Sequence, residues 1–370
     1  MCSRSNLRTA AITILVLGLL PAGCDTLNPG DDVGFQTTAL VSNRLLFAGH
    51  SDVSGDAALK LRVINVLSSN QVYEMGAGGH DYSSPDIVDR SNGTFFIGFG
   101  RTKLKVLDTF FFKVKSVKGI GSQQRAINFN GQDQESFTYM DGSPAAGFDI
   151  LVQNGIDASP VAITSDGSSS ISNWTPCYSL DAQWILYAKI PAGATSGSGC
   201  ELWRIHPDGT GAELLPITTD EVPTYATWNP EGTEVFVPGD FTSYLISDGT
   251  VGKFDHCREL ESVSTKLAEW GYELVGSPVT GPIHEGDTVT PVRHTFPISA
   301  IWLPGDKLYL EALVAHNDGI TPAPHAIAGV GIFTWSQKAR ELLKNLNPIP
   351  MSESNSENYS LSIMHPSIIP

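Results

Sequence analysis

Residues 178–187 read YSLDAQWILY, which is an aromatic residue, a polar turn and then an apolar run rich in β-forming residues. Fifty residues later the same order returns as WNPEGTEVFV at residues 228–237, and a third copy, WLPGDKLYL, spans residues 302–310. Turns of Pro, Gly, Asp and Asn between such segments are typical of β-hairpins. Each copy therefore predicts one strand that ends at the aromatic residue and a second, largely buried strand after the turn.

A further strand and turn follow each hairpin. These segments are ELWRIHPDGTG at residues 201–211, SYLISDG at residues 243–249 and GIFTWSQK at residues 331–338. Six units that recur about every 40 to 50 residues are the signature of a β-propeller or a related array. Weaker copies of the hairpin, which complete the six, lie at residues 42–47, 91–97 and 135–139.

The stretch from Tyr178 to Gly249 resembles the WD40-like repeat of TolB-type β-propellers, through its Ser-x-Asp turn, its Glu-Leu-Trp-Arg-Ile strand and its Pro-Asp-Gly-Thr-Gly turn. The resemblance implies blades of four antiparallel strands around a central channel. We therefore predict an all-β fold, with a six-bladed propeller over residues 37–346 and a seven-bladed one as the alternative.

The interval between the second and third copies is longer than fifty residues, and the surplus falls in residues 255–295. Within it, Arg258–Trp270 (RELESVSTKLAEW) has apolar residues at helical spacing. This pattern predicts a partly helical insertion between blades. Residues 347–370 are predicted to form a C-terminal tail, in which Ser360–Met364 offers a closing strand for the first blade.

The N-terminal segment predicts the compartment. Arg4 and Arg8 precede an uncharged apolar run at residues 9–20, and Cys24 follows Pro-Ala-Gly. A positive start, a short apolar core and small residues before a cut are typical of a secretory signal. The run is too short for a permanent membrane helix, which needs roughly 20 residues.

Cys24, directly after Ala22-Gly23, resembles the lipidated cysteine of bacterial lipoproteins, although Pro21 stands where that pattern usually has Leu. We predict that residues 1–23 are removed, that Cys24 carries the lipid and that residues 24–36 form a flexible tether. An ordinary cleaved signal and an uncleaved anchor are the alternatives.

Asp25 resembles a retention signal for the inner membrane, which favours its periplasmic face. The outer membrane and the cell surface remain alternatives.

Charge and motifs exclude several function classes. The chain has 23 Lys and Arg against 39 Asp and Glu, and a net charge of −16. Because phosphate binding depends on Lys and Arg, nucleic acid is not an expected partner. The sequence contains no P-loop, no G-x-S-x-G elbow and no G-x-G-x-x-G after a strand. We predict no catalytic residues and no cofactor.

Three cysteines beyond Cys24 raise the question of a disulfide. The hairpin register places Cys177 and Cys200 about six residues apart along the sheet, which is roughly 20 Å. A disulfide needs Cα atoms within about 7 Å, so we expect no bond between them. The pairing of Cys257 is left open.

Possible metal ligands and turn aspartates are interpreted as structural. The cluster of His284, Glu285, Asp287 and His294 lies in the insertion and lacks the spacing of a zinc site, which predicts a polar surface loop instead of a metal site. Aspartates within the repeated turns are expected to bond their own backbone and not calcium. These turn residues are Asp181, Asp208 and Asp248.

Cations and tryptophans also recur in patterns. A cationic segment is interpreted as one solvated sheet face that protects an edge, with contact to anionic lipid head groups or cell-wall polymers as the alternative. Its members are Arg101, Lys103, Lys105, Lys113, Lys115 and Lys118.

A set of tryptophans in fixed register with the turns is predicted to pack in the core and not to form a carbohydrate platform. This set is Trp184, Trp203, Trp228, Trp302 and Trp335.

These observations predict a membrane-tethered lipoprotein of the bacterial cell envelope that binds a protein partner without catalysis. The contact surface would be a propeller face or the insertion at residues 255–295. The alternative is an envelope enzyme, or a binder of glycans or small molecules, that uses the central funnel. Converging carboxylates, histidines or arginines at the channel would favour the alternative, and an apolar or Ser/Thr lining would favour the scaffold.

Overall fold

The computed structural model describes most of the central part of the chain and mainly separate strands of the remainder. The described residues are 44–51, 56–65, 72–75, 86–89, 95–100, 103–108, 111, 113–194, 196–270, 272–274, 299–303, 307–316, 327–345 and 367–369.

The described strands form six antiparallel sheets, which we number in chain order. Sheet 1 contains β24 (Ser367–Ile369), β1 (Arg44–Ser51), β2 (Asp56–Asn65) and β3 (Val72–Met75). Sheet 2 contains β4 (Asp86–Asp89), β5 (Phe95–Phe99), β6 (Lys105–Asp108) and β7 (Lys113–Ser116). Sheet 3 contains β8 (Gln123–Phe129), β9 (Ser136–Ser143), β10 (Gly147–Asn154) and β11 (Val161–Ala162).

The other three sheets differ in the number of strands. Sheet 4 contains β12 (Ile171–Tyr178), β13 (Ile185–Pro191), β14 (Glu201–Ile205) and β15 (Glu213–Leu214). Sheet 5 contains β16 (Thr227–Trp228), β17 (Glu234–Val237) and β18 (Thr242–Leu245). Sheet 6 contains β19 (Tyr272–Leu274), β20 (Ser299–Leu303), β21 (Lys307–His316), β22 (Ile327–Ser336) and β23 (Glu341–Asn345).

The propeller is confirmed, but the predicted number of complete blades is wrong. Among the described residues, five sheets have four or five strands, and sheet 5 has three. After β18 the chain turns through Gly249, whose φ is 72°, and a Cβ there would lie 1.7 Å from the carbonyl oxygen of Pro216. Beyond this turn the chain runs beside β18, with backbone hydrogen bonds between Leu245 and Thr250 and between Ser243 and Gly252. It pairs with β18 at one isolated bridge, Tyr244 with Val251, and so does not form a regular fourth strand.

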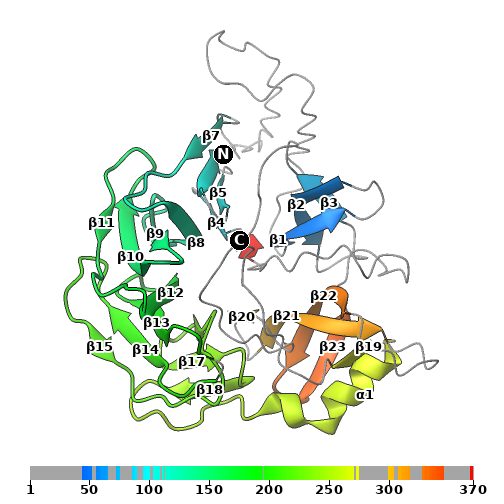
Figure 1. The fold of residues 1–370 in the computed structure, drawn as a ribbon. Helices are drawn as coiled ribbons and strands as arrows, with labels where there is room; N and C mark the ends of the chain where they lie inside the picture. The colour runs from blue at the N-terminus through cyan, green and yellow to red at the C-terminus, as the bar shows by residue number, and fades with distance from the viewer. Residues whose placement is uncertain are drawn as a thin grey trace, which may run out of the picture.

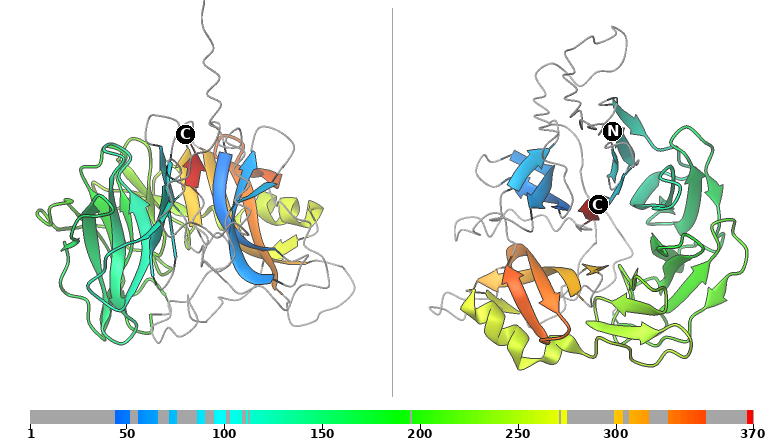
Figure 2. Two further views of the ribbon diagram at one scale, coloured as in Figure 1. Left: turned by 90° about the horizontal axis from the view of Figure 1, so that it is seen from above. Right: turned by 180° about the vertical axis from the view of Figure 1, so that it is seen from behind.

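The first strands of the sheets form the inner wall of the ring. β24 contacts β4, β4 contacts β8, β8 contacts β12, β12 contacts β16, and β16 contacts β20. Figure 1 shows β4, β8, β12 and β20 facing the centre, and the right-hand view of Figure 2 shows the same ring from behind. β24 pairs with β1, so the last described strand joins the first sheet. This closing strand lies at residues 367–369, beyond the segment that the sequence indicated.

The repeated sequence forms the hairpins that it predicts. Tyr178 pairs with Ile185, and in the second copy Trp228 pairs with Val235. In the first turn Ala182 takes the left-handed conformation, with a φ of 56°. The corresponding residue of the second turn is Gly232, with a φ of 69°, and glycine adopts this conformation without steric cost. The backbone of the turn is therefore the same although the residue differs.

The insertion is partly helical, as its periodicity predicts. A 3₁₀ turn at Cys257–Glu259 leads into α1 (Glu261–Glu269), whose buried residues are Val263 and Leu267. Across the described ranges, no helix is long and apolar enough to cross a membrane.

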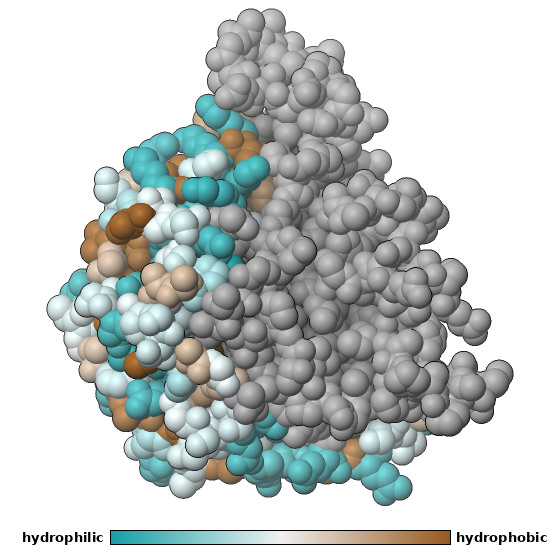
Figure 3. Space-filling view, viewed as in Figure 1, coloured by the Kyte–Doolittle hydropathy of each residue, from teal (hydrophilic) through white to brown (hydrophobic). Residues whose placement is uncertain are grey.

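The core lies between neighbouring sheets and contains many aromatic rings. Phe236 of sheet 5 packs edge-to-face against Trp302 of sheet 6, with ring centroids 6.2 Å apart. Phe254 lies between them in sequence and packs edge-to-face on Trp302 at 4.7 Å. Such pairs add about 0.5–1.5 kcal/mol beyond the burial of their area. On the described part of the face in Figure 3, hydrophobic residues are scattered among hydrophilic ones.

Candidate functional site: the inner wall of the ring

Three inner segments carry the same backbone irregularity. Ala126, Thr175 and Tyr225 have φ angles of 51°, 46° and 57° and lie 49 and 50 residues apart. The register of β8 shifts between Arg125 and Asn128, and that of β12 shifts between Trp174 and Cys177. These shifts are β-bulges, which bend a strand and redirect its side chains. A left-handed conformation costs a non-glycine residue roughly 1–3 kcal/mol, so the surrounding contacts must hold it.

A hydrogen-bond chain connects the inner strands of sheets 2, 3 and 4. The Oδ2 of buried Asp86 accepts bonds from the amide of Phe129 at 2.7 Å and from the side-chain Nδ2 of Asn128 at 3.2 Å. The Oδ1 of Asn128 accepts a bond of 2.8 Å from the amide of Tyr178. Asn128 therefore bridges two neighbouring strands with both ends of its amide.

The chain of hydrogen bonds continues from sheet 4 to sheet 5. The indole Nε1 of Trp228 donates to the carbonyl oxygen of Cys177 at 3.1 Å. The amide of Tyr225 donates to the hydroxyl of Thr175, also at 3.1 Å. Each bond joins residues about fifty positions apart, so the repeat period also sets the contacts between sheets.

A small pocket opens at these three left-handed residues. Its lining contains aliphatic, hydroxyl, amide, thiol and phenol groups, and none of the lining residues is a carboxylate, histidine, lysine or arginine. The lining residues are Ala126, Ile127, Asn128, Thr175, Pro176, Cys177, Tyr225 and Ala226. Imidazole, carboxylate and amine groups are therefore missing from this lining, and of the side chains that act as general acids or bases only the thiol of Cys177 and the phenol of Tyr225 are present.

The thiol in the pocket is a weak acid. Burial raises the pKa of Cys177 to about 12, and the negative charge of Asp86 acts in the same direction. The thiolate is the reactive form of cysteine, so this side chain is a poor nucleophile at neutral pH. Cys177, Cys200 and Cys257 are all free thiols in the structure. Cys177 lies opposite Leu186, which lies opposite Arg204, and Cys200 precedes Arg204 by four residues. The two cysteines are thus four positions apart along the sheet and not about six, and they are not bonded.

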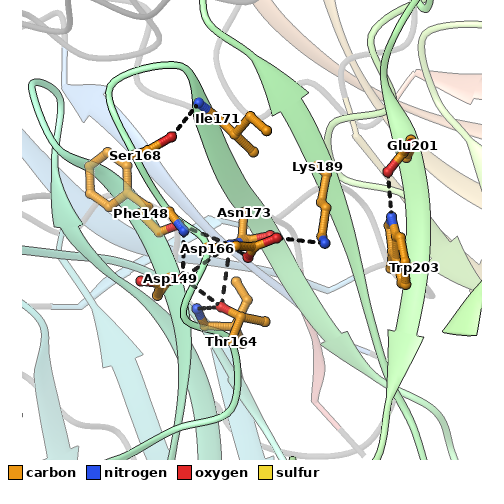
Figure 4. Close-up of polar contacts among 12 residues, drawn as sticks. Phe148, Asp149, Thr164, Asp166, Ser168, Ile171, Asn173, Lys189, Glu201 and Trp203 are labelled. Atoms are coloured by element: carbon orange, nitrogen blue, oxygen red, sulfur yellow. Dashed lines mark hydrogen bonds and ion pairs between the residues drawn. The ribbon is translucent and has the colours of Figure 1, made fainter. Parts of the chain in front are cut away.

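A second polar network joins sheets 3 and 4 (Figure 4). The Nδ2 of fully buried Asn173 lies 3.1 Å from Asp149 Oδ1 and 2.9 Å from Asp166 Oδ1. The hydroxyl of Thr164 donates to Asp149 Oδ1 at 2.9 Å. The Lys189 ammonium lies 2.6 Å from Asp166 Oδ2. These contacts neutralise one carboxylate and link the two sheets, which is a structural role.

The turn aspartates occupy the positions that the sequence predicts. Asp208 Oδ1 accepts bonds from the amide and hydroxyl of Thr210, at 2.9 and 2.7 Å. Asp248 makes the same pair of bonds with Thr250. Asp181 accepts a bond from the amide two residues later, at 3.1 Å. Across the described ranges, no group of three or more His, Cys, Asp or Glu residues could hold a metal ion.

The tryptophan prediction is correct for three of its five residues. Trp228, Trp302 and Trp335 are buried. Trp184 and Trp203 are partly buried, and each lies beside a cation: Arg204 lies 4.2 Å from the ring centroid of Trp184, and Lys189 lies 4.1 Å from that of Trp203. Trp184 also stacks on His206. Cationic and histidine side chains of the same sheet therefore cover the faces of these two rings.

The cationic segment does not form one face. Lys105 lies opposite Ser116, whereas Lys113 lies opposite Asp108. Residues that are paired across strands share a face, so Lys105 points to one side of sheet 2 and Lys113 to the other, together with Lys115. The prediction of a single cationic face is wrong. β7 is nevertheless the edge strand of its sheet, as the edge interpretation requires.

Several predicted features lie outside the described residues. They are the signal segment at residues 1–23, the tether with Cys24 and Asp25, and the cluster of His284, Glu285, Asp287 and His294.

The bulge residues were not among the candidates from the sequence. Ala, Thr and Tyr give no local signal for a left-handed conformation, because Gly, Asn and Asp are the residues that usually adopt it. The sequence feature that could have identified these residues is the repeat period of the hairpins. Asn128, Cys177 and Trp228 follow one another at the same spacing as the hairpins, on strands that adjoin in the ring.

No family model matches this sequence, and no curated protein sequence is significantly similar to it. Solved structures are similar in fold. TolB from Acinetobacter baumannii aligns with a TM-score of 0.52 and 12% identity, over 89% of this chain and 67% of that one. A chain of a nidogen/laminin complex aligns with a TM-score of 0.50 and 9% identity, over 88% of this chain and 98% of that one. At such identities the similarity shows the propeller fold alone.

Proposed function

We propose that this chain is a non-enzymatic binding scaffold of the bacterial cell envelope, which a lipid at Cys24 tethers to the membrane and which binds a protein partner. The observation that carries the proposal is the neutral lining of the pocket at the inner wall. Acid–base and nucleophilic catalysis both need titratable groups placed at the reacting atoms. The thiol of Cys177, with its raised pKa, supplies no such group at neutral pH.

The rigidity of the inner wall supports a scaffold. Asn128 and Thr175 use their side chains to hold neighbouring sheets together. A surface that is already ordered loses little conformational entropy when a partner binds. The wall therefore favours binding of a partner over rearrangement around a substrate.

The face that holds the β8–β9 and β12–β13 turns is the proposed contact surface. Leu180 is 64% exposed at the tip of the second turn. The side-chain Nε2 of Gln132, from the first turn, donates to the carbonyl oxygen of Leu180 at 2.8 Å, so the two turns form one surface. The second copy of the repeat has Pro230 at this position. A large apolar side chain on a fixed turn suits a protein contact, where buried apolar anchors supply much of the affinity.

The proposed location is the periplasmic face of the inner membrane. The support is the sequence before the propeller, in which Cys24 follows Ala22-Gly23 and precedes Asp25. The tether of residues 24–36 would leave the propeller free to meet its partner near the membrane.

The test is affinity purification of the full-length chain from detergent-solubilised membranes of its host, read by mass spectrometry. The control is the same chain with Cys24→Ala, which removes the lipid attachment. The proposal expects one abundant envelope protein that is lost or strongly reduced in the control. A lipidated chain that purifies without a partner, and that turns over or binds a glycan or small molecule, would overturn it.

A further inference from the structure

We propose that the outer edge of sheet 2 rests on an anionic lipid surface. This edge is β7, the last strand in the order of its sheet. Phe111 precedes the strand and Ile120 follows it, and their side chains are 69% and 70% exposed. They are the two most exposed large hydrophobic residues described in this chain. Phe111 thus lies before the edge strand, and Ile120 lies after it where the chain reaches sheet 3, with its amide donating to Asp141 of β9 at 2.6 Å.

Three lysines lie between these two apolar residues. They are Lys113, Lys115 and Lys118, in a stretch of ten residues that reads FFKVKSVKGI. Lys115 pairs with Asp157 at 2.6 Å, and the Nζ of Lys118 donates to the carbonyl oxygen of the same residue at 2.5 Å. Two carboxylates, Asp108 opposite Lys113 and Asp157 beside Lys115, therefore face the three cations, and the edge keeps one net positive charge. The whole chain, by contrast, has a net charge of −16.

Charge and apolar exposure together identify the occupant. Lysines near an anionic bilayer are attracted to its surface, and the attraction is screened by salt. A hydrated polyanion would satisfy the lysines but would leave Phe111 and Ile120 in water. A lipid surface satisfies both, because apolar side chains enter the boundary between head groups and acyl chains.

The contact does not depend on the lipid at Cys24. The β6–β7 hairpin belongs to the propeller, and it would orient the ring relative to the membrane that the tether holds nearby. A test in the full chain carrying Cys24→Ala therefore separates this proposal from the proposed function. Failure of the lipid contact would leave the partner-binding proposal untouched, and the reverse also holds.

The experiment is vesicle flotation of the full chain carrying Cys24→Ala. Vesicles of phosphatidylcholine alone are compared with vesicles that contain phosphatidylglycerol as three lipids in ten. We expect binding to be about tenfold tighter or more on the anionic vesicles, and to weaken in high salt. Hydrogen exchange of the backbone amides at residues 113–118 should slow on the anionic vesicles only.

Charge reversal tests the lysines. Lys113→Glu, Lys115→Glu and Lys118→Glu together should abolish the preference for anionic vesicles. The matched control reverses three cations elsewhere, Lys266→Glu, Lys338→Glu and Arg340→Glu, and should keep the preference. Thermal unfolding of each variant shows that the propeller is intact.

Loss of the apolar anchors completes the test. Phe111→Ser with Ile120→Ser should weaken binding to anionic vesicles about tenfold or more. The reason is that serine lacks the favourable free energy that an apolar side chain gains on moving from water into the interface. An anionic preference that survives the lysine reversal would overturn the proposal. The proposal also fails if the serine variant binds unchanged while soluble dextran sulfate competes with the vesicles, since that result assigns the edge to a hydrated polyanion.

Discussion

The hydroxyl of Thr175 accepts a hydrogen bond of 3.1 Å from the backbone amide of Tyr225, and the two residues have similar left-handed φ angles of 46° and 57°. They belong to the inner segments of neighbouring sheets and lie fifty residues apart. A β-branched residue rarely adopts this conformation, so the bond and the packing around it must hold the backbone there. This hydrogen bond therefore links one repeat to the next at the inner wall of the ring.

Thr175→Val should destabilise the fold by about 1–3 kcal/mol. The substitution keeps the shape of the side chain but removes the oxygen that accepts the buried amide of Tyr225. Equilibrium unfolding in urea measures the effect. Thr175→Ser keeps the hydroxyl and should recover part of the loss. Thr250→Val, in an exposed turn, should cost less. Equal stability of the valine variant and the parent would contradict the proposed role of this bond.

Asn128→Asp should be destabilising at neutral pH. The change removes the Nδ2 donor and places a second carboxylate beside Asp86, at an atom that now lies 3.2 Å from Asp86 Oδ2. Because two adjacent carboxylates resist ionising together, the loss should shrink as pH falls toward 4 and one of them takes a proton. The measurement is the free energy of unfolding of parent and variant between pH 4 and 7. The same change at Asn130, whose contact with Asp133 is exposed, should have a smaller effect; equal effects would argue against the bridge.

The turns of the repeat could be predicted from sequence because their chemistry is local. A short run such as residues 178–187 contains both the turn and the apolar strand that follows it. The bulges could not be predicted in this way, because contacts from other sheets hold Ala126 and Thr175 in their conformations. Alanine and threonine do not by themselves favour a left-handed conformation.

The lysine face was mispredicted for a reason of register. Alternation along each strand does not by itself decide which residues of β6 and β7 oppose one another. With Asp108 opposite Lys113, odd-numbered residues of β6 oppose even-numbered residues of β7. Lys105 and Lys113 therefore lie on opposite faces, although each strand alternates as expected. The fourth strand of sheet 5 was also mispredicted, because the segment beyond Gly249 hydrogen-bonds to β18 but pairs with it at one isolated bridge.

Two aspartates near sheet 5 should respond to pH with opposite signs. Burial raises the pKa of Asp240 above its ordinary 3.8, and this outweighs the hydrogen bond from Tyr244. Its protonated form therefore favours the folded state, and the stability it contributes is full below pH 3.8 and is lost as pH rises through the folded pKa. The hydroxyl of Thr250 lowers the pKa of Asp248, whose contribution is present above pH 3.8 and is lost as pH falls through its lowered pKa.

The measurement is the stability of Asp240→Asn and Asp248→Asn relative to the parent, from pH 3 to 7. As pH rises, the free energy of unfolding of the Asp240 variant should increase relative to that of the parent. The free energy of unfolding of the Asp248 variant should decrease relative to that of the parent. The two variants act as controls for each other, because each keeps the shape of the side chain and removes its charge. Parallel pH profiles would contradict the assigned environments.

The three described thiols should resist alkylation in the folded chain. Burial is the main cause that raises the pKa of Cys177 to about 12 and those of Cys200 and Cys257 to about 11. At pH 8 the thiolate is then about one part in a thousand or less. Iodoacetamide treatment followed by peptide mapping should show slow labelling of all three, and rapid labelling in guanidinium chloride. Fast modification of Cys177 in the folded protein would contradict the raised pKa of this thiol.

The central claim, that the propeller binds a protein partner through the face around Leu180, is tested most directly by site-specific photo-crosslinking in the host cell. A photoreactive phenylalanine analogue replaces Leu180, and the matched control places it at Leu214, which is 49% exposed on β15. The account predicts one discrete crosslinked species from position 180 that is missing from position 214 and depends on Cys24. No crosslink from position 180, or the same products from both positions, would contradict it.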